Sequence, residues 1–303
     1  MVDMLFVVWT LVPCFFATFP HSPTFELGGE RDSEFYRVKD VAMAADGSIW
    51  TLARDDAFLR HYTPDGSLSA KFAGTGDGPG ELRKPHEALV VDDELWVCEL
   101  ETGRISVFAG NRFVRHIKLN NRPRSLVEVG GHIVAAPSFR HEPFVVLAPG
   151  GQILREFHLE DFTLPTPSDG ASKNGWEMFV ATATAEGLAL NFYFMPVLVE
   201  VDLQGRLTNL WQTTLYEAHV TRIGRGSIPA YFASRGMGID GEGMAWLGVC
   251  AESGGCPELL VLDLKRHAMV RREAFPESLY RVRYLNDYAV FITGQGHARF
   301  FRR

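Results

Sequence analysis

The chain has 303 residues, of which 46% are hydrophobic and 22% are charged, and it contains 29 glycines and 16 prolines. This composition excludes disordered and collagen-like proteins, because it supplies enough apolar side chains for a full core and many turn formers. The formal net charge of -7 argues against nucleic acid as the main partner, since phosphate binding normally needs a basic domain or stripe.

An apolar run opens the chain, and residues 5–19 are interrupted only by Thr10, Pro13 and Thr18. Its length is typical of the hydrophobic part of an export signal and is short for a membrane-spanning helix. We therefore predict that residues 1–20 are a signal peptide or membrane anchor. The protein is then extracytoplasmic, meaning periplasmic, secreted or membrane-anchored. The alternative is a buried edge strand.

A strand-turn-strand pattern repeats from residue 23 onward. Six tight turns rich in Asp, Gly and Asn each join two alternating apolar strands, and such turns are hairpin signals because these residues tolerate positive φ. The turns lie at residues 45–48, 91–94, 129–132, 185–188, 240–243 and 285–288. The strands that follow them lie at residues 49–52, 95–98, 133–135, 188–192, 244–247 and 289–292.

A third strand follows each of these second strands, and a second turn then leads to a fourth. The third strands lie at residues 58–62, 105–108, 144–147, 198–201, 259–262 and 298–301. Trp50, Trp96 and Trp246 occupy equivalent places in their second strands. They are therefore predicted to pack in the core rather than to form a binding platform.

The turn count predicts how the fold closes. There are six first turns but only five second turns, so one fourth strand is missing. Residues 23–27 have the alternation to supply it, and pairing them with the last sheet would close a ring without a free edge. We predict an all-β, six-bladed β-propeller of four-stranded blades over residues 23–303, with the last blade closed by the N-terminal strand and no helix.

The second unit resembles the NHL repeat and the bacterial six-bladed propellers related to it. The resemblance covers residues 72–108 and rests on GTGDGPGEL at residues 74–82, Pro85, VVD at 90–92, LWV at 95–97 and RISVF at 104–108. It implies a propeller for the whole chain. It implies little about activity, because this broad group includes ligand and RNA binders, scaffolds and a few metal-dependent enzymes.

In a propeller the first strand of each blade lines a central channel, and the connections between blades open on one face that usually hosts the site. Two such connections, residues 159–176 and 214–229, are long, and a third, residues 74–85, is rich in glycine. The long ones lack strand patterns and are predicted to be loops. Long loops in a compact fold are often functional, although a plain insertion is the alternative.

Basic residues gather at or just before the first strands and in one long loop. If they converge, they would favour an anionic ligand, because arginine offers planar bidentate donors to carboxylate or phosphate. The alternative is that they pair with nearby carboxylates, namely Asp40, Glu87, Glu128 and Glu177. The candidate binding residues are Arg37, Lys39, Arg83, His86, Arg122, Arg124, Arg222, Arg225, Arg281 and Arg283.

A metal-dependent hydrolase or lyase is the second hypothesis. It needs inward-facing oxygen or imidazole ligands from several blades, and the available residues are Asp40, His86, Glu87 and Glu177. Positive charge beside them would oppose a cation. The glycine-rich residues 76–80 and 236–238 are weak as phosphate loops, because neither stretch precedes a helix. No catalytic residue, metal or cofactor is assigned.

Cys250 and Cys256 flank a turn-like loop. A disulfide across this hairpin would suit an exported protein, and two unpaired thiols are equally compatible, because the sequence does not fix the geometry. The sequence thus predicts a non-catalytic extracytoplasmic propeller that binds a ligand or protein partner, anionic by hypothesis, through its loop-rich face. Membrane contact is expected only through the N-terminal segment, if this segment is uncleaved or lipidated. RNA binding is disfavoured by the net charge and the predicted export.

Overall fold

The fold was obtained as a computed structural model. It describes residues 22–29, 36–54, 56–162, 178–193, 197–212, 219–223, 226–230, 233–250, 258–266, 268–275, 277 and 279–302. Side chains are not described for residues 212, 219–223, 226–230, 233–235 and 249–250. All statements below concern the described part of the chain.

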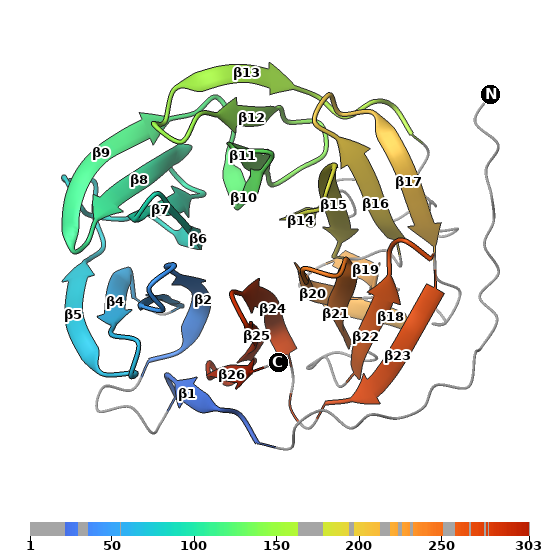
Figure 1. The fold of residues 1–303 in the computed structure, drawn as a ribbon. Coiled ribbons are helices and arrows are strands. Elements are labelled where there is room, and N and C mark those ends of the chain that lie inside the picture. Colours follow the sequence, from blue (N-terminus) through green and yellow to red (C-terminus); the bar gives the residue numbers. More distant parts are fainter. Residues whose placement is uncertain are drawn as a thin grey trace.

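Six four-stranded antiparallel sheets stand in a ring, with the first strand of each sheet nearest the axis (Figure 1). This confirms the predicted six-bladed β-propeller. Blade 1 contains β2 (Val38–Met43), β3 (Ile49–Ala53), β4 (Phe58–Tyr62) and β5 (Leu68–Ala73). Blade 2 contains β6 (Pro85–Val91), β7 (Glu94–Glu99), β8 (Arg104–Ala109) and β9 (Arg112–Lys118). Blade 3 contains β10 (Pro123–Val129), β11 (His132–Pro137), β12 (Phe144–Leu147) and β13 (Ile153–Phe157).

The second half of the ring follows the same order. Blade 4 contains β14 (Phe179–Ala183), β15 (Gly187–Phe192), β16 (Val197–Asp202) and β17 (Leu207–Gln212). Blade 5 contains β20 (Ala233–Ile239), β21 (Met244–Cys250), β22 (Glu258–Asp263) and β23 (Ala268–Ala274). Blade 6 contains β24 (Leu279–Leu285), β25 (Tyr288–Thr293), β26 (Ala298–Arg302) and, from the other end of the chain, β1 (Phe25–Leu27).

The closing strand β1 confirms the prediction made from the uneven turn count. It pairs antiparallel with β26, with Phe25 opposite Phe300 and Leu27 opposite Ala298. The ring of Phe25 also stacks on that of Phe300, with 4.2 Å between the ring centroids. Residues from opposite ends of the chain therefore complete one sheet.

The core lies between the blades rather than in one central mass. Six hydrophobic clusters are present among the described residues, and each joins two neighbouring blades, including one between blade 6 and blade 1. The equivalent tryptophans Trp50, Trp96 and Trp246 belong to three of these clusters and are buried, as predicted. Every blade is thus held by apolar packing on both flanks.

A β-bulge recurs at the start of the innermost strand in five of the six blades. The register shifts lie between Val38 and Asp40, Pro85 and Glu87, Pro123 and Ser125, Ser234 and Gly236, and Leu279 and Arg281, whereas β14 has none. Bulges re-aim side chains and are common beside functional sites. Here each bulge lies at the face on which the innermost strands begin, which we call the entry face.

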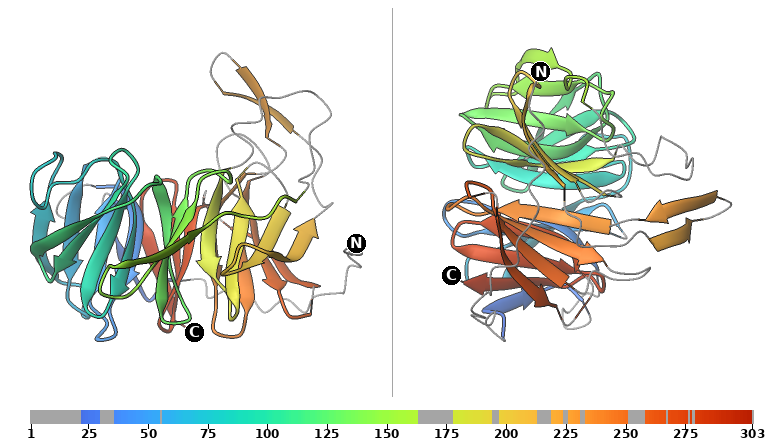
Figure 2. Two further views of the ribbon diagram at one scale, coloured as in Figure 1. Left: turned by 90° about the horizontal axis from the view of Figure 1, so that it is seen from above. Right: turned by 90° about the vertical axis from the view of Figure 1, so that its right-hand side faces the viewer.

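A two-stranded hairpin, β18 (His219–Ile223) with β19 (Gly226–Ala230), stands out from the ring on the entry face (Figure 2). The prediction that residues 214–229 lack strands is wrong for this hairpin. Ile223 pairs with Gly226, so only Gly224 and Arg225 separate the two strands. A two-residue turn that begins with glycine is a hairpin signal, and the nearby Gly, Ser and Pro residues obscured it.

The predicted N-terminal segment, residues 1–20, lies outside the described residues. The part of the chain that the structure describes contains no helix with the length and apolar character needed to cross a bilayer. The other long connection, residues 159–176, is described only as far as residue 162.

Candidate functional site

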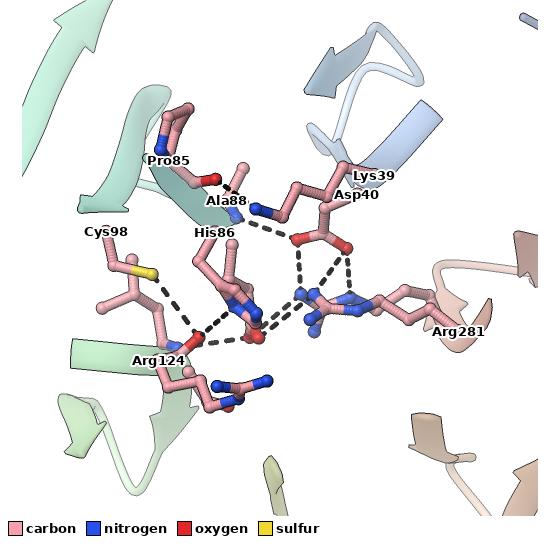
Figure 3. Close-up of polar contacts among 12 residues, drawn as sticks. Lys39, Asp40, Pro85, His86, Ala88, Cys98, Arg124 and Arg281 are labelled. Carbon is pink, nitrogen blue, oxygen red and sulfur yellow. Dashed lines mark hydrogen bonds and ion pairs between the residues drawn. The ribbon is translucent and has the colours of Figure 1, made fainter. Parts of the chain in front are cut away.

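Seven polar side chains from four blades meet near the axis of the ring, and we call them the axial cluster (Figure 3). Four of them are cationic, two are carboxylates and one is a histidine. The members are Lys39, Asp40, His86, Glu87, Arg124, Arg281 and Arg283. Each blade that contributes does so from the bulge or the residues beside it on its innermost strand.

Acceptor side chains join the innermost strands of the first four blades. Asp40 accepts a hydrogen bond of 2.9 Å from the backbone N–H of Ala88 in blade 2. Glu87 does the same for Leu126 in blade 3, at 3.2 Å. Ser125 accepts from Ala181 in blade 4, at 3.3 Å. At the three successive contacts from blade 1 to blade 4, the side chain at the same bulge position therefore accepts a hydrogen bond from an otherwise unpaired amide of the next blade.

Two arginines of blade 6 bind the carboxylates of blades 1 and 2. Arg283 donates from Nε and Nη2 to the two oxygens of Asp40, at 2.9 and 2.6 Å, and its Nη2 lies 2.9 Å from Glu87. Nη1 of Arg281 lies 3.0 Å from an oxygen of Asp40 and 3.2 Å from one of Glu87. These ion pairs close the ring at its axis, as β1 closes it at its rim.

The ion pairs set the charge state of Asp40. Burial alone would raise the pKa of this fully buried carboxyl, but the charges of Arg281 and Arg283 outweigh it and lower the pKa. Asp40 is therefore ionised and compensated at neutral pH. The alternative prediction, that basic residues pair with Asp40 and Glu87, holds for Arg281 and Arg283.

Lys39 and Arg124 differ from these two arginines, because neither has a carboxylate partner among the described residues. Nζ of Lys39 donates to the carbonyl of Pro85 at 2.7 Å. The guanidinium of Arg124 lies 4.8 Å from the ring centroid of Tyr193, and its buried Nε has no hydrogen-bond partner in the described structure. Both side chains are half-buried.

Burial, with a further contribution from the charge of Arg281, lowers the pKa of Lys39 to about 8. Lys39 is thus mainly protonated at neutral pH and loses its charge in mildly alkaline solution. The axial cluster then holds four cations against two carboxylates. It has an excess of positive charge inside a protein whose formal net charge is -7.

His86 is buried beside these cations. Its Nδ1 lies 2.9 Å from the carbonyl oxygen of Arg124, which can only accept, so Nδ1 carries the proton and Nε2 keeps its lone pair. Burial, followed by the charge of Arg124, lowers the pKa of His86 well below its usual value. Burial likewise raises the pKa of Cys98, whose thiol contacts the same carbonyl oxygen. Both side chains are neutral at pH 7.

The structure brings together five of the ten predicted binding residues, namely Lys39, His86, Arg124, Arg281 and Arg283. Arg83 lies in the turn between blades and forms an exposed ion pair with Asp77 instead. Arg122 is exposed just before β10, and Arg37 packs against Gly296 just before β2. The side chain of Arg222 and all of Arg225 lie outside the described residues.

The residues proposed as metal ligands do not form a suitable set in the described structure. Within the described ranges, no group of three or more His, Cys, Asp or Glu side chains could hold a metal ion. The oxygens of Asp40 and Glu87 are bound by guanidinium groups, whose charge would oppose a divalent cation. Glu177 lies outside the described residues, and so do Cys256 and the side chain of Cys250, for which a disulfide and two free thiols are equally compatible with the sequence.

Structural reasons account for both glycine-rich stretches. In the turn at residues 74–82, the carboxylate of Glu81 accepts from the N–H of Gly78 at 2.8 Å, and a Cβ on Gly76 would collide with this carboxylate. At Gly236, a Cβ would stand 2.5 Å from the Cα of Arg281. The first stretch forms a turn between blades, and the second lets β20 approach β24.

A small hollow with room for about one water molecule lies between blades 4, 5 and 6. It is lined by Glu87, Val180, Ala181, Thr182, Gly236, Met237, Arg281, Val282 and Arg283. Sequence reasoning missed the blade 4 residues and Met237, because they are ordinary apolar or small strand residues. When the innermost strands are aligned with one another, Val180 and Gly236 fall at the position where blades 1 to 3 have a side chain that accepts a hydrogen bond.

No protein-family model and no curated protein sequence matches this chain. Several solved structures share its fold at low identity. One is a protein of unknown function from Bacteroides thetaiotaomicron, with a TM-score of 0.62 and 11% identity over 93% of this chain and 72% of that one. Virginiamycin B lyase from Staphylococcus aureus has a TM-score of 0.58 and 11% identity, over 92% and 98%.

A third similar structure is the WD40 β-propeller domain of Doa1, with a TM-score of 0.54 and 9% identity over 94% of this chain and 98% of that one. An enzyme and a WD40 domain thus share the same architecture. At these identities the comparisons show a β-propeller and no particular activity.

Proposed function

We propose that this protein is a non-catalytic β-propeller that binds an anionic ligand or partner on its entry face, at Lys39 and Arg124. One observation carries the proposal. The two carboxylates of the axial cluster are already bound by Arg281 and Arg283, so the charges of Lys39 and Arg124 are left without a carboxylate in the described structure. A half-buried cation without a carboxylate partner favours the binding of an anion from outside the protein.

The hydrogen-bonding pattern supports an anion rather than a cation. Arg124 has a buried Nε without a partner, and Lys39 uses one donor on a backbone carbonyl and keeps its others. His86, held neutral between them, can accept a hydrogen bond at Nε2 without adding charge. A ligand that carries a carboxylate or phosphate and a neighbouring hydroxyl would match these three side chains.

We further propose an extracytoplasmic location, with residues 1–20 as the export signal or anchor. Strand polarity gives this a geometric consequence. Leu27, at the end of β1, pairs with Ala298 at the start of β26, so β1 runs toward the entry face and its first residues lie at the opposite face. An N-terminal anchor would therefore leave the entry face directed away from the membrane.

A relationship to NHL-like propellers is likewise a proposal. It is supported by the compact turn at residues 74–82, in which the N–H of Leu82 donates to the carbonyl of Gly74 at 2.8 Å and the side chain of Leu82 is fully buried. This arrangement explains why the motif needs its glycines and its leucine between two blades.

The test is calorimetric titration with citrate, a small polycarboxylate, at low and high salt. In K39M/R124Q we expect binding at least tenfold weaker, equivalent to about 1.4 kcal/mol, and a smaller salt dependence. The matched control is R112Q/K118M, which removes the same charge from exposed positions on β9. Equal citrate binding by both double variants would contradict the proposal.

A further inference from the structure

Lys39 extends into the axial cluster from an irregular point of its strand. It is the extra residue of the β-bulge in β2, between Val38 and Asp40, and its Nζ donates to the carbonyl of Pro85 in blade 2 at 2.7 Å. The side chain is half-buried, so part of it stays in contact with solvent. An uncharged amine at this place would keep the bond to Pro85 through one N–H and would still have a lone pair.

The surroundings of Lys39 favour the uncharged form of its amine. Burial, together with the charges of Arg281 and Arg124, lowers the pKa of Lys39 to about 8, and the charge of Asp40 offsets this only in part. At pH 7.5 about a quarter of the molecules therefore carry an uncharged amine, about a hundredfold more than for an exposed lysine. A lysine whose charge is disfavoured by burial and by neighbouring cations is an activated nucleophile.

The charge count of the axial cluster indicates what the cluster gains if this amine reacts. Lys39 and three arginines face only two carboxylates, those of Asp40 and Glu87, when the lysine is protonated. Deprotonation of Lys39 leaves three cations against two anions. A covalent step that places a negative charge on the lysine side chain would leave three cations against three anions, and the cluster would then be electrically neutral.

The neighbouring cations that oppose the ammonium form of Lys39 would favour an anion on the same side chain. Burial penalises both charged forms, so the sign of the surrounding charge decides between them. Arg124 contributes to that charge, and its buried Nε has no hydrogen-bond partner in the described structure. His86 is neutral and leaves the balance unchanged. An anionic group on Lys39 would therefore meet positive charge that no carboxylate of the axial cluster compensates.

We propose that Lys39 is a reversible carbon dioxide site, at which its amine forms a carbamate. The lone pair of Nζ attacks the carbon atom of carbon dioxide and an N–C bond forms. One C–O π bond breaks, its electron pair stays on that oxygen, and a proton passes from the nitrogen to solvent. Carbon dioxide is small and uncharged, so it needs no large cavity. The carbamate keeps one N–H for the carbonyl of Pro85.

The carbamate would regulate the anion site. It removes one cation of the site and adds an anion beside Arg124, so carbon dioxide and an external anion exclude each other. This regulatory part rests on the proposed function, whereas formation of the carbamate does not depend on it.

The first experiment detects the carbamate on the whole protein. Carbon-13 NMR in labelled bicarbonate, in equilibrium with carbon dioxide at pH 7.5, should show a carbamate resonance. Trapping with triethyloxonium followed by peptide mass spectrometry should place the ethylated carbamate on Lys39, with a yield about tenfold higher than on the exposed Lys118 of β9. K39R should lack the carbamate resonance, because arginine keeps its proton at this pH.

The second experiment tests regulation by titrating citrate with and without carbon dioxide and bicarbonate, at constant pH and ionic strength. Carbon dioxide should weaken citrate binding about fivefold, and citrate should weaken carbamate formation by the same factor, because coupling between two ligands is reciprocal. K39R is the matched control, since it keeps the positive charge but forms no carbamate. In this variant citrate binding should not depend on carbon dioxide, whereas simple competition by bicarbonate would persist.

Three results would overturn the inference in whole or in part. Absence of a carbamate resonance, or equal trapping yields on Lys39 and Lys118, would remove the carbon dioxide site. An equal effect of carbon dioxide on citrate binding in K39R and the unaltered protein would remove the regulation. If citrate binds at Lys39 and Arg124 but no carbamate forms, the proposed function stands and this inference fails. If the carbamate forms but K39M/R124Q binds citrate as well as its control, the carbon dioxide site stands and the proposed function fails.

Discussion

The two halves of the ring use one structural repeat in opposite ways. In blades 1 to 3 the bulge residues Asp40, Glu87 and Ser125 each bind an amide of the next blade. In blades 4 and 5 the same position holds Val180 and Gly236, and there Thr182 instead donates to the carbonyl of Met237 at 3.1 Å. Repetition of a backbone thus does not require repetition of its contacts.

Blade 6 links the two halves. It places Arg281 where the first blades place acceptors and Arg283 two residues further along β24, and these arginines bind the carboxylates of blades 1 and 2. The first half of the ring is therefore joined by acceptor side chains at the bulges. In the second half, Thr182 donates from blade 4 to blade 5, and blades 5 and 6 approach closely through their backbones at Gly236.

The largest effect is expected from Asp40→Ala. This change leaves Arg281 and Arg283 short of a buried counter-charge and removes the acceptor for Ala88, so we expect a loss of about 3–5 kcal/mol in the free energy of unfolding. Ser125→Ala is the comparison, because it removes an uncharged acceptor at the same repeat position and should cost only about 1 kcal/mol. Denaturant unfolding of both variants measures the difference, and equal losses would argue against a structural role for the charge.

Gly236→Ala tests the other half of the ring. An added Cβ would stand 2.5 Å from the Cα of Arg281 and 2.7 Å from the N of Val282, so β20 and β24 would have to separate. Overpacking of this kind costs about 1–3 kcal/mol. Gly241→Ala is the matched control, because nothing lies within 4 Å of its Cβ. Thermal unfolding should separate the two variants, and similar midpoints would mean that blades 5 and 6 are not held this closely.

A smaller effect on citrate binding is expected from the charge of Lys39. Its pKa is about 8, so the charge can be removed by raising the pH. Raising the pH through 8 removes one positive charge from the axial cluster. Citrate binding should therefore weaken by up to about tenfold between pH 7 and pH 9.5. Arg124→Gln should move this transition to higher pH, because the positive charge of Arg124 helps to lower the pKa of Lys39. If the affinity for citrate does not change between pH 7 and pH 9.5, Lys39 does not contact the ligand.

The smallest effect is expected at the rim, where Glu26 of β1 contacts His297 and binds Arg299 at 2.9 Å. Burial raises the pKa of Glu26, but its bonds to Arg299 and His297 outweigh this and lower it. A carboxyl with a lowered pKa stabilises the fold above its unfolded-state pKa, and that contribution is lost as the pH falls through the folded-state pKa.

Glu26→Gln should therefore cost less than about 1 kcal/mol at pH 7 and nothing once the carboxyl is protonated in strongly acidic solution. Unfolding curves of both proteins across this range provide the check. A loss as large as that of Asp40→Ala would mean that the ring is closed mainly at its rim.

Most of the fold could be predicted from the sequence, because hairpin turns and strand alternation are local signals. The turns at residues 45–48 and 285–288 mark hairpins of blades 1 and 6, and the unmatched strand at residues 23–27 indicates closure. The hairpin β18–β19 escaped notice because glycine, serine and proline hide its alternation.

The site could be predicted only in part. The sequence shows basic residues at the start of the innermost strands, but it does not show which carboxylate or carbonyl each of them contacts. Arg281 meets Glu87 across 194 positions of sequence, and Arg83 turns instead to Asp77, six residues away. Which of two consecutive residues faces the axis depends on a bulge, and a bulge has no local sequence signature here. The absence of an acceptor at Val180 and Gly236 appears only when the blades are superposed.

The most direct test of an anion site at Lys39 and Arg124 is a crystal structure of the protein grown with citrate. We expect citrate on the entry face with its carboxylates on Nζ of Lys39 and the guanidinium of Arg124, while Arg281 and Arg283 stay bound to Asp40 and Glu87. A structure in which Lys39 and Arg124 pair with carboxylates of the protein itself, and citrate is absent from the axial cluster, would contradict it.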